Sequence, residues 1–292
     1  MKTALFGKAL SPENRVHVQY LIKKLEKEAR QLYIYSKYYD IICNCIDFTV
    51  PVIVFSSHEE IKSEIDCLIS IGGDGTLLDS VPLVRDSGIP ILGINVGRLG
   101  FLSSVSKDEI DNAVACLRNK TYELDARGLL RLDTKEKLFG ELNFALNELT
   151  INRKNSNSLI VIHVWINDKL LNSYWADGII ISTPTGSTAY SLSSGGPIIT
   201  PEAECFVITP IATHNLTVRP FVIPDNCRIQ IKIEGRDKEY LVGLDSRSES
   251  IDSSVKLEIV KEKFQVNLVR IPGKHFLDTI REKLKWGQDI RN

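Results

Sequence analysis

The chain has 292 residues, of which 43% are hydrophobic and 25% are charged, a composition typical of globular proteins and unlike that of disordered ones. Its 36 Lys and Arg residues nearly balance its 37 Asp and Glu residues, and the formal charge of −1 argues against a mainly electrostatic partner such as nucleic acid or an anionic membrane. At roughly 150 residues per domain, the length predicts two domains.

No stretch of the sequence indicates a membrane or export segment. The apolar runs fall short of the roughly 18 residues of a membrane helix, and Gly7 and Lys8 interrupt the apolar core that a signal peptide needs. The six cysteines form no C-x-x-C pair and the five histidines are scattered, so neither a disulfide framework nor a zinc site is indicated. We therefore expect a cytoplasmic protein without a metal site of its own.

The first part of the chain alternates helix-like and strand-like segments. Apolar side chains recur at helical spacing from Pro12 to about Tyr33 and over 77–84, and a capping box that begins at Ser106 opens a further helix. Short apolar runs between these segments, at 52–55, 67–71 and 90–96, predict buried strands. Strands that alternate with helices form a parallel sheet covered on both faces, so we expect an α/β domain over residues 1–124.

From about Tyr122 to Arg270 the pattern changes to short, often alternating apolar runs. Examples lie at 159–166, 178–183, 229–234 and 255–260, separated by turn-prone groups such as 155–158. They predict an all-β domain of two packed sheets over residues 125–273. Beyond Pro272 and Gly273, helical spacing predicts a terminal helix within 274–292, which we expect to pack back on the first domain.

The apolar run 67–71 ends in the glycine-rich sequence Gly72–Thr76 (GGDGT), which leads into a helix. Glycines at such a turn let an anion approach the backbone, and the N–H groups that open a helix favour negative charge. A carboxylate such as Asp74 repels a nearby phosphate, so its presence in this turn implies a specific task. Alternatively, Asp74 caps the helix, a position where Asp is common. A glycine-rich turn by itself is weak evidence for a phosphate site.

Two further features point to ligand binding. The stretch from Thr183 to Pro197 combines small hydroxyl residues and glycines with an aromatic, Tyr190, and is suited to hold sugar and phosphate oxygens while Tyr190 stacks on a base; a structural loop is the alternative. Asn147 and Glu148 end an apolar run, where an adjacent amide and carboxylate can bracket a ribose diol or an adenine edge, or simply form a strand-end turn. The stretch contains no G-x-S-x-G nucleophile motif.

Together and in this order, these features resemble the ATP-dependent NAD kinases. The similar segments span essentially the whole chain: GGDGT at 72–76, then 97–102, Asn147-Glu148, 176–178, 183–197, 214–220 and a tail at 281–287. GGDGT alone also occurs in diacylglycerol and sphingosine kinases and, as a variant, in phosphofructokinases. The stretch 183–197 joined to Asn147-Glu148 is what indicates an NAD kinase.

The resemblance implies a Rossmann-like first domain, related to that of diacylglycerol kinases and phosphofructokinases, and a dinucleotide-binding second domain. The implied reaction transfers the γ-phosphoryl group of ATP, with Mg²⁺ or another divalent cation, to the 2′-hydroxyl of the adenosine ribose of NAD, giving NADP and ADP. Asp74 would be the proton acceptor. The implied binding residues are Gly72, Gly73, Gly75, Thr76, Phe101, Asn147, Glu148, Asp177, Thr188, Ala189, Tyr190, Ser191, Leu192, Ser193 and Ala212. A homo-oligomer, dimer or tetramer, is also implied.

The sequence departs from the family pattern at a few positions. Trp175 stands where many relatives carry a basic residue, and is alternatively a core aromatic of the second domain. Ser158 and Arg247 stand where a His and a Gln are frequent, and Asp245-Ser246 replaces the usual Asp-Gly, so the role of Arg247 in binding stays open. Two other functions also stay open: a lipid kinase of the diacylglycerol type, and a non-catalytic NAD(P) sensor, which would have no need of Asp74.

Overall fold

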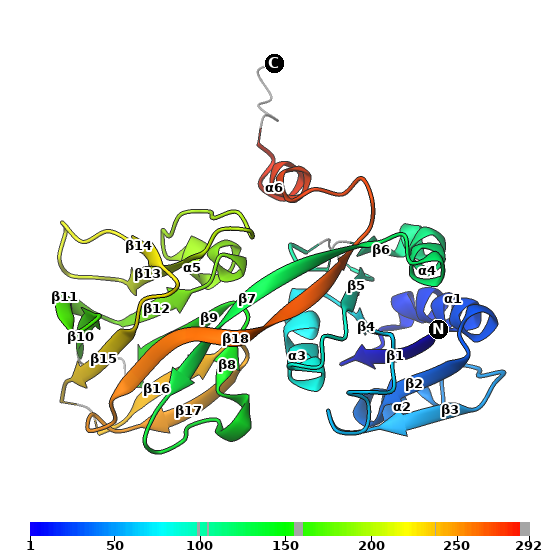
Figure 1. The fold of residues 1–292 in the computed structure, drawn as a ribbon, viewed down its shortest axis with the longest axis horizontal. Helices are drawn as coiled ribbons and strands as arrows, with labels where there is room; N and C mark the ends of the chain where they lie inside the picture. The colour runs from blue at the N-terminus through cyan, green and yellow to red at the C-terminus, as the bar shows by residue number, and fades with distance from the viewer. Residues whose placement is uncertain (98–99, 104, 155–159, 237, 287–292) are drawn as a thin grey trace. The chain divides into compact units, whose positions relative to one another are not determined.

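The computed structural model describes residues 1–97, 100–103, 105–154, 160–236 and 238–286 (Figure 1). The chain divides into two compact units, the first formed by Met1–Ala126 with Val266–Asn292 and the second by Arg127–Gln265. The second boundary therefore lies at 265/266, whereas the change of sequence pattern placed it at 273/274. The reason is that Val269 and Ile271, near the end of the last strand, are buried in the hydrophobic core of the first unit.

The first unit contains a parallel sheet with helices. In chain order its elements are β1 (Lys2–Gly7), α1 (Pro12–Glu28), β2 (Gln31–Tyr35), α2 (Ser36–Ile42), β3 (Val52–Phe55), β4 (Cys67–Ile71), α3 (Asp74–Val84), β5 (Ile91–Asn95), β6 (Val105–Ser106), the 3-10 turn η1 (Lys107–Glu109), α4 (Ile110–Asn119) and α6 (Phe276–Leu284). The strand order is β5-β4-β1-β2-β3, with every neighbouring pair parallel. The predicted α/β class of this part is confirmed.

The predicted helix from Pro12 to about Tyr33 is too long. Helix α1 begins where the Ser11 hydroxyl accepts the N–H of Asn14, with Pro12 in its first turn, and ends at Glu28. Strand β2 follows almost at once. The apolar residues that open β2 continue the helical spacing of α1 by chance, so periodicity alone merges the two elements.

The second unit is built of antiparallel strands. Its elements are β7 (Glu123–Asp133), which begins in the first unit, then η2 (Gly140–Leu142), β8 (Phe144–Ala145), β9 (Glu148–Arg153), β10 (Ile160–Ile166), β11 (Lys169–Ala176), β12 (Gly178–Ser182), η3 (Thr185–Thr188), α5 (Tyr190–Ser193), β13 (Cys205–Ile211), β14 (Phe221–Pro224), β15 (Ile229–Glu234), β16 (Tyr240–Leu244), β17 (Arg247–Ile251) and β18 (Leu257–Arg270), which ends in the first unit. One sheet has the order β14-β13-β12-β9-β16-β17, and the other includes β11-β10-β15-β18.

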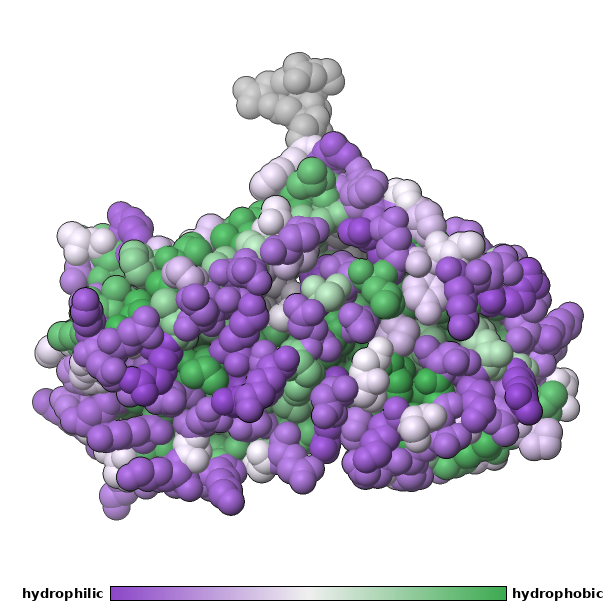
Figure 2. All heavy atoms as spheres, in the orientation of Figure 1, coloured by the Kyte–Doolittle hydropathy of each residue, from purple (hydrophilic) through white to green (hydrophobic). Residues whose placement is uncertain are grey.

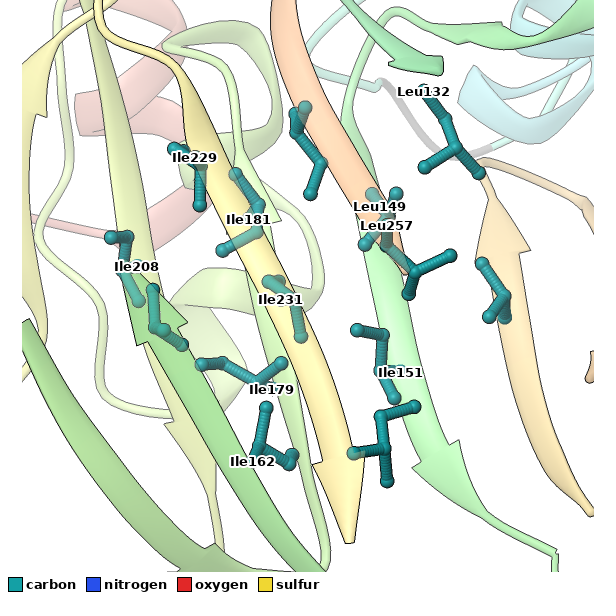
Figure 3. Packing of buried hydrophobic residues seen from close by; sticks show 14 of the residues in the cluster. Leu132, Leu149, Ile151, Ile162, Ile179, Ile181, Ile208, Ile229, Ile231 and Leu257 are labelled. Atoms are coloured by element: carbon teal, nitrogen blue, oxygen red, sulfur yellow. The ribbon is translucent and has the colours of Figure 1, made fainter. Parts of the chain in front are cut away.

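The two sheets of the second unit enclose a core rich in isoleucine. Ile179 and Ile181 of β12 are fully buried, as are Ile162 of β10 and Ile229 of β15. Figure 3 shows these side chains between the strands. Alternate residues of each strand point inward, which is the packing of a β-sandwich. The predicted class, two packed sheets, is confirmed.

Hydrophilic side chains cover most of the face seen in Figure 2, with hydrophobic residues scattered among them. Among the described residues, no helix has both the length and the apolar character needed to cross a bilayer.

Candidate active site

The GGDGT turn follows directly on the buried strand β4. Gly72 adopts φ 150°, and its N–H donates to the carbonyl of Ile94 on the neighbouring strand at 2.9 Å. A Cβ at this position would lie 2.4 Å from Oγ1 of Thr76, so no other residue fits. Gly73 and Gly75 are different: both are exposed, and a Cβ on either would have no atom within 4 Å. The start of α3 is therefore open to solvent along these two glycines.

The interpretation of Asp74 as a helix cap is wrong. Gly73 is the N-cap residue of α3, no side chain among the described residues caps the helix, and Asp74 is the first residue inside it. The carboxylate turns instead to the segment that precedes β6. Oδ2 accepts the N–H of Phe101 at 2.7 Å, while Oδ1 accepts the N–H groups of Leu102 and Ser103 at 3.0 and 2.9 Å.

These three hydrogen bonds leave the Asp74 carboxylate able to accept one more. An ionised carboxylate offers about four acceptor positions, two on each oxygen. Described residues occupy both positions on Oδ1 and one on Oδ2. One position on Oδ2 therefore remains for a donor such as a substrate hydroxyl, on a carboxylate whose orientation is fixed.

The segment 100–103 is shaped around this carboxylate. A Cβ on Gly100 would lie 1.8 Å from Oδ1 of Asp74, so only glycine fits there. Phe101, predicted as a pocket wall, is half-buried, and Nζ of Lys283 on α6 lies 5.7 Å from the centre of its ring. Arg98 and Leu99 of the same motif lie outside the described residues. Sequence reasoning identified Asp74 and Phe101 separately and did not predict that they are hydrogen-bonded.

In the second unit, Asn147 and Glu148 are fixed by a residue to which sequence reasoning gave no role. The carboxylate of Asp245, in the turn between β16 and β17, accepts the N–H groups of Leu146 and Asn147 at 2.8 Å each and that of Glu148 at 3.2 Å. Asp245 adopts φ 52°, a conformation that Asp tolerates better than most residues. In the sequence, the only indication of a special role for this turn was that Asp245-Ser246 replaces the usual Asp-Gly.

Asn147 and Glu148 both present buried polar atoms that no described residue satisfies. Asn147 is 6% exposed and Glu148 9%, and neither Oδ1 of Asn147 nor Oε2 of Glu148 has a hydrogen-bond partner among the described residues. Buried polar atoms without partners are uncommon, because each costs about 1–3 kcal/mol. Two such atoms on adjacent residues are expected where a bound ligand supplies the missing hydrogen-bond partners.

The electrostatic setting of Glu148 is unusual for a carboxyl group. Burial, and to a smaller extent the negative charge of nearby Asp245, raise its pKa from 4.5 to about 8, against the opposing effect of the backbone N–H of Tyr190. Burial likewise raises the pKa of Asp245, against the effect of the N–H groups of Leu146 and Asn147. Glu148 is therefore largely protonated at neutral pH and can donate a hydrogen bond.

Several hydroxyls of the 183–197 stretch are used inside the fold. Thr183 Oγ1 donates to the carbonyl of Leu146 at 2.6 Å, and Ser187 Oγ donates to the carbonyl of Pro184 at 2.7 Å. Ser191, predicted as a binding residue, is fully buried, with its hydroxyl 2.9 Å from that of Thr209. These side chains shape the segment, and the hydroxyl of Ser191 has no access to a ligand.

Other predicted residues of this stretch do reach the surface. The side chain of Tyr190 is 42% exposed, Ser193 is exposed, and Thr188, Ala189 and Leu192 are half-buried. All five lie on η3, α5 or between them, the elements that follow the buried strand β12. Gly186 in η3 packs directly on Asn147, since a Cβ there would lie 2.1 Å from the Asn147 carbonyl oxygen. The structure thus brings the 183–197 stretch and Asn147-Glu148 together.

Asp177 and Ala212 lie at the end of the neighbouring strands. Asp177 pairs with Arg153, with 3.0 Å between Oδ2 and Nη2, and its side chain is 32% exposed. Ala212 is exposed and adopts φ 47°, a strained conformation for alanine of the kind that gathers at functional sites. The N–H of Asp177 donates to the carbonyl of Ile211, so the two predicted residues are neighbours.

Arg247 supports the backbone. Its guanidinium donates to the carbonyls of Leu142 and Phe144 and lies 5.5 Å from the centre of the Phe144 ring. Trp175 is 57% exposed, so its interpretation as a core aromatic is wrong. Arg127 is a buried cation that sequence reasoning missed: it is 6% exposed, and Nη1 donates to Thr185 Oγ1 at 3.3 Å. Ser158 lies outside the described residues.

Two cavities of the molecule do not involve these residues. One of about 540 Å³ in the first unit is lined by the end of β5, by residues 106–109 of β6 and η1, and by 273–282, which include most of helix α6. One of about 670 Å³ in the second unit is lined by Trp165, Gln230 and several Lys and acidic residues. None of the described lining residues is a predicted site residue. Within the described ranges, no three His, Cys, Asp or Glu side chains gather closely enough to hold a metal ion.

Comparison with known proteins identifies the family. Residues 20–122 match the model of the ATP-NAD kinase N-terminal domain, and residues 146–271 match that of the ATP-NAD kinase C-terminal domain. The NAD kinase of Cytophaga hutchinsonii is 44% identical over 289 residues, 99% of each chain, and that of Flavobacterium psychrophilum is 47% identical over 294 aligned positions, 100% of each chain. The chain belongs to the ATP-NAD kinase family.

Solved structures agree with the fold. The yeast NADH kinase complexed with NADH superposes with a TM-score of 0.86 at 26% identity, over 100% of this chain and 89% of that one. The NAD kinase from Archaeoglobus fulgidus in complex with ATP superposes with a TM-score of 0.72 at 24% identity, over 98% and 99%. The resemblance to the ATP-NAD kinase family drawn from the motifs is confirmed.

Proposed function

We propose that the protein is an ATP-dependent NAD kinase, which transfers the γ-phosphoryl group of ATP to the 2′-hydroxyl of the adenosine ribose of NAD and forms NADP and ADP. Membership of the ATP-NAD kinase family over nearly the whole chain supports this activity. The observation that carries the proposal is the carboxylate of Asp74, held by three N–H groups with one acceptor position left on Oδ2.

In this proposal Asp74 aligns the 2′-hydroxyl and accepts its proton. Phosphoryl transfer passes through a loose transition state that needs little early push from the nucleophile, so orientation matters more than basic strength. A carboxylate whose direction is fixed by backbone N–H groups is suited to this role. The exposed glycines Gly73 and Gly75 would lie along the phosphates.

We assign dinucleotide binding to the remaining predicted residues. Asn147 and Glu148 offer the unpaired amide oxygen and the protonated carboxyl described above, which match the hydroxyl and ring oxygens of a ribose. Tyr190, with Thr188, Ala189, Leu192 and Ser193, would contact a base or its sugar. Phe101, Asp177 and Ala212 would complete the contacts. Arg247 and the hydroxyl of Ser191 act on the protein's own backbone and side chains instead.

Magnesium would enter with ATP as part of the substrate. Mg²⁺ is usually held by substrate phosphates and few protein groups. We further propose a cytoplasmic location, on the basis of the sequence features described above, and a homo-oligomer, on the basis of the family resemblance. Light scattering on a sizing column, which gives the mass of the particle in solution, tests the second point.

The decisive experiment incubates purified protein with MgATP and NAD and measures NADP. NADP formation that requires ATP supports the proposal. Phosphorylation of diacylglycerol without NADP formation would instead indicate a lipid kinase. Calorimetric binding of NAD or NADP with no ATP consumption would indicate a sensor.

A further inference from the structure

The GGDGT turn and the helix that follows it supply no positively charged side chain to the proposed phosphate site. Residues 72–84, which form the GGDGT turn and helix α3, contain two carboxylates, Asp74 and Asp79, and no Lys or Arg. Phosphoryl transfer nevertheless depends on cations that balance the charge of the transferred group and its leaving phosphates. Besides Mg²⁺, a cationic side chain is therefore expected from an element that neighbours this turn.

Strand β1 brings such a side chain to the turn. It pairs with β4 in parallel register, with Gly7 opposite Ile71, the last residue of each strand. The next residues, Lys8 and Gly72, therefore leave the sheet at the same edge. In open α/β sheets, ligands bind at the carboxyl ends of the strands, which is this edge.

Lys8 already reaches over α3. Its Nζ forms an ion pair with Oδ2 of Asp79, while the Lys8 side chain remains 57% exposed and Asp79 is 17% exposed. Asp79 lies five residues beyond Asp74, about 7.5 Å along the helix axis. A lysine side chain has four rotatable bonds, so a swing of this size brings Nζ from Asp79 to the first turn of α3.

We propose that Lys8 binds the phosphates of ATP, and that Asp79 holds the ammonium group beside the site until ATP arrives. This inference rests on the proposed function of the GGDGT turn. A purely structural role for the Lys8–Asp79 pair is weakly motivated, because an ion pair with so exposed a partner contributes about 0–1 kcal/mol to stability. When Lys8 leaves Asp79 for a phosphate of ATP, its ammonium group exchanges one anionic oxygen partner for another.

The test uses Lys8→Met, which keeps the length of the side chain and removes its charge. We expect kcat/KM for ATP to fall about 10- to 100-fold, the range for losing a charge-assisted hydrogen bond, with KM for NAD unchanged. Calorimetry of ADP in EDTA, without metal, should show a similar loss of affinity. Lys8→Arg, which keeps the charge, should recover most of both.

Two control variants separate phosphate binding from folding. Lys2→Met removes an ion-paired lysine at the opposite end of β1, where Nζ lies 3.0 Å from Oε2 of Glu64, and should leave both measurements unchanged. Asp79→Asn breaks the Lys8 pair but keeps the cation, so ADP affinity in EDTA should not fall. If Asp79→Asn weakens ADP binding as much as Lys8→Met does, the ion pair is structural and the proposal is wrong.

The outcomes also distinguish this proposal from that of NAD kinase activity. Unchanged kcat/KM for ATP in Lys8→Met, with an active wild-type enzyme, overturns the role of Lys8 alone. A wild-type protein that forms no NADP overturns the proposed function, and ADP calorimetry then decides about Lys8. Weaker ADP binding by Lys8→Met supports its role, whereas equal ADP binding by the two proteins, including none by either, overturns it.

Discussion

At the scale of single residues, Asp74 has two tasks that one substitution cannot separate. Its carboxylate orients the segment 101–103 and is the proposed proton acceptor. In Asp74→Asn, the amide nitrogen must face at least one of the three N–H donors, which leaves that donor unpaired. The variant therefore loses part of its local order as well as the base.

We expect Asp74→Asn to lower kcat by about 10²–10⁴-fold, the usual contribution of general base catalysis, and to lower the melting temperature as well. Turnover and thermal unfolding measured on the same preparation check both effects. Asp40→Asn, an exposed carboxylate on α2, should change neither. Turnover near that of the wild type in Asp74→Asn would remove the proposed role.

Gly100 tests the orientation of Asp74 without changing its chemistry. In Gly100→Ala the new methyl group would overlap Oδ1 of Asp74, so the carboxylate or the segment 100–103 must shift. Because a misplacement of about 1 Å can reduce catalysis on the order of 10²-fold, we expect a fall of this size in kcat. Gly128→Ala is the control, because a Cβ at Gly128 would have no atom within 4 Å. Equal kcat for Gly100→Ala and Gly128→Ala would contradict this.

The raised pKa of Glu148 predicts a pH dependence of stability. Because the pKa of Glu148 is about 8 in the folded protein and near 4.5 when unfolded, the folded state holds a proton that the unfolded state releases between these values. Stability from this group therefore falls as pH rises from about 5 to 8. Glu148→Gln mimics the protonated form. The difference between its free energy of unfolding and that of the wild type should therefore move in favour of the variant as the pH rises toward 9. Urea unfolding at pH 5, 7 and 9 measures this, with exposed Glu136→Gln as the control; parallel pH curves for wild type and Glu148→Gln would refute it.

At the scale of elements, the β16–β17 turn acts as a support for the start of β9. Asp245 accepts three backbone N–H groups from 146–148, and Arg247 donates to the carbonyls of Leu142 and Phe144. One hairpin end thus fixes a segment about 100 positions earlier in the chain. The proposed ribose contacts of Asn147 and Glu148 depend on it.

Asp245→Ala should therefore act on the dinucleotide and on stability together. Leaving three N–H groups without an acceptor, at about 1–3 kcal/mol each, is expected to lower the free energy of unfolding by at least about 3 kcal/mol and to raise KM for NAD more than KM for ATP. Steady-state kinetics with each substrate varied in turn, together with urea unfolding, checks both effects. Asp252→Asn, in an exposed position beyond β17, is the control. An equal rise of KM for both substrates would contradict the local role of this turn.

Elements were predictable from sequence where a local signal determines them. The Ser106 capping box is present, with the N–H of Ser106 donating to Glu109 Oε2 at 2.9 Å, and the run 229–234 is a strand within the same bounds. Helix α2 and the end of α1 were not predictable, because a short helix and a following buried strand leave no break in the apolar spacing.

The site residues that belong to family motifs were predictable as a set. Their contacts, such as that of Asp74 with 101–103, join distant positions and leave no local pattern.

At the scale of the whole molecule, the second unit is a continuous insertion into the first. It has its own buried core, and its two connections, β7 and β18, pair with each other. We expect a fragment covering 123–270 to fold alone, with a β-type circular dichroism spectrum and one cooperative thermal transition. A fragment ending at 233, which lacks β16, β17 and β18, is the matched control and should not fold. Absence of a transition in the longer fragment would show that its core depends on the first unit.

This insertion also sets an order for synthesis on the ribosome. The core of the first unit includes Val269 and Ile271, and Leu268 pairs with Ile91 beside the strand that ends in the GGDGT turn. Those residues follow 127–265 in the chain, so every strand of the sandwich leaves the ribosome before the α/β half receives its last strand. Catalytic competence would then be among the final properties that a newly made molecule acquires.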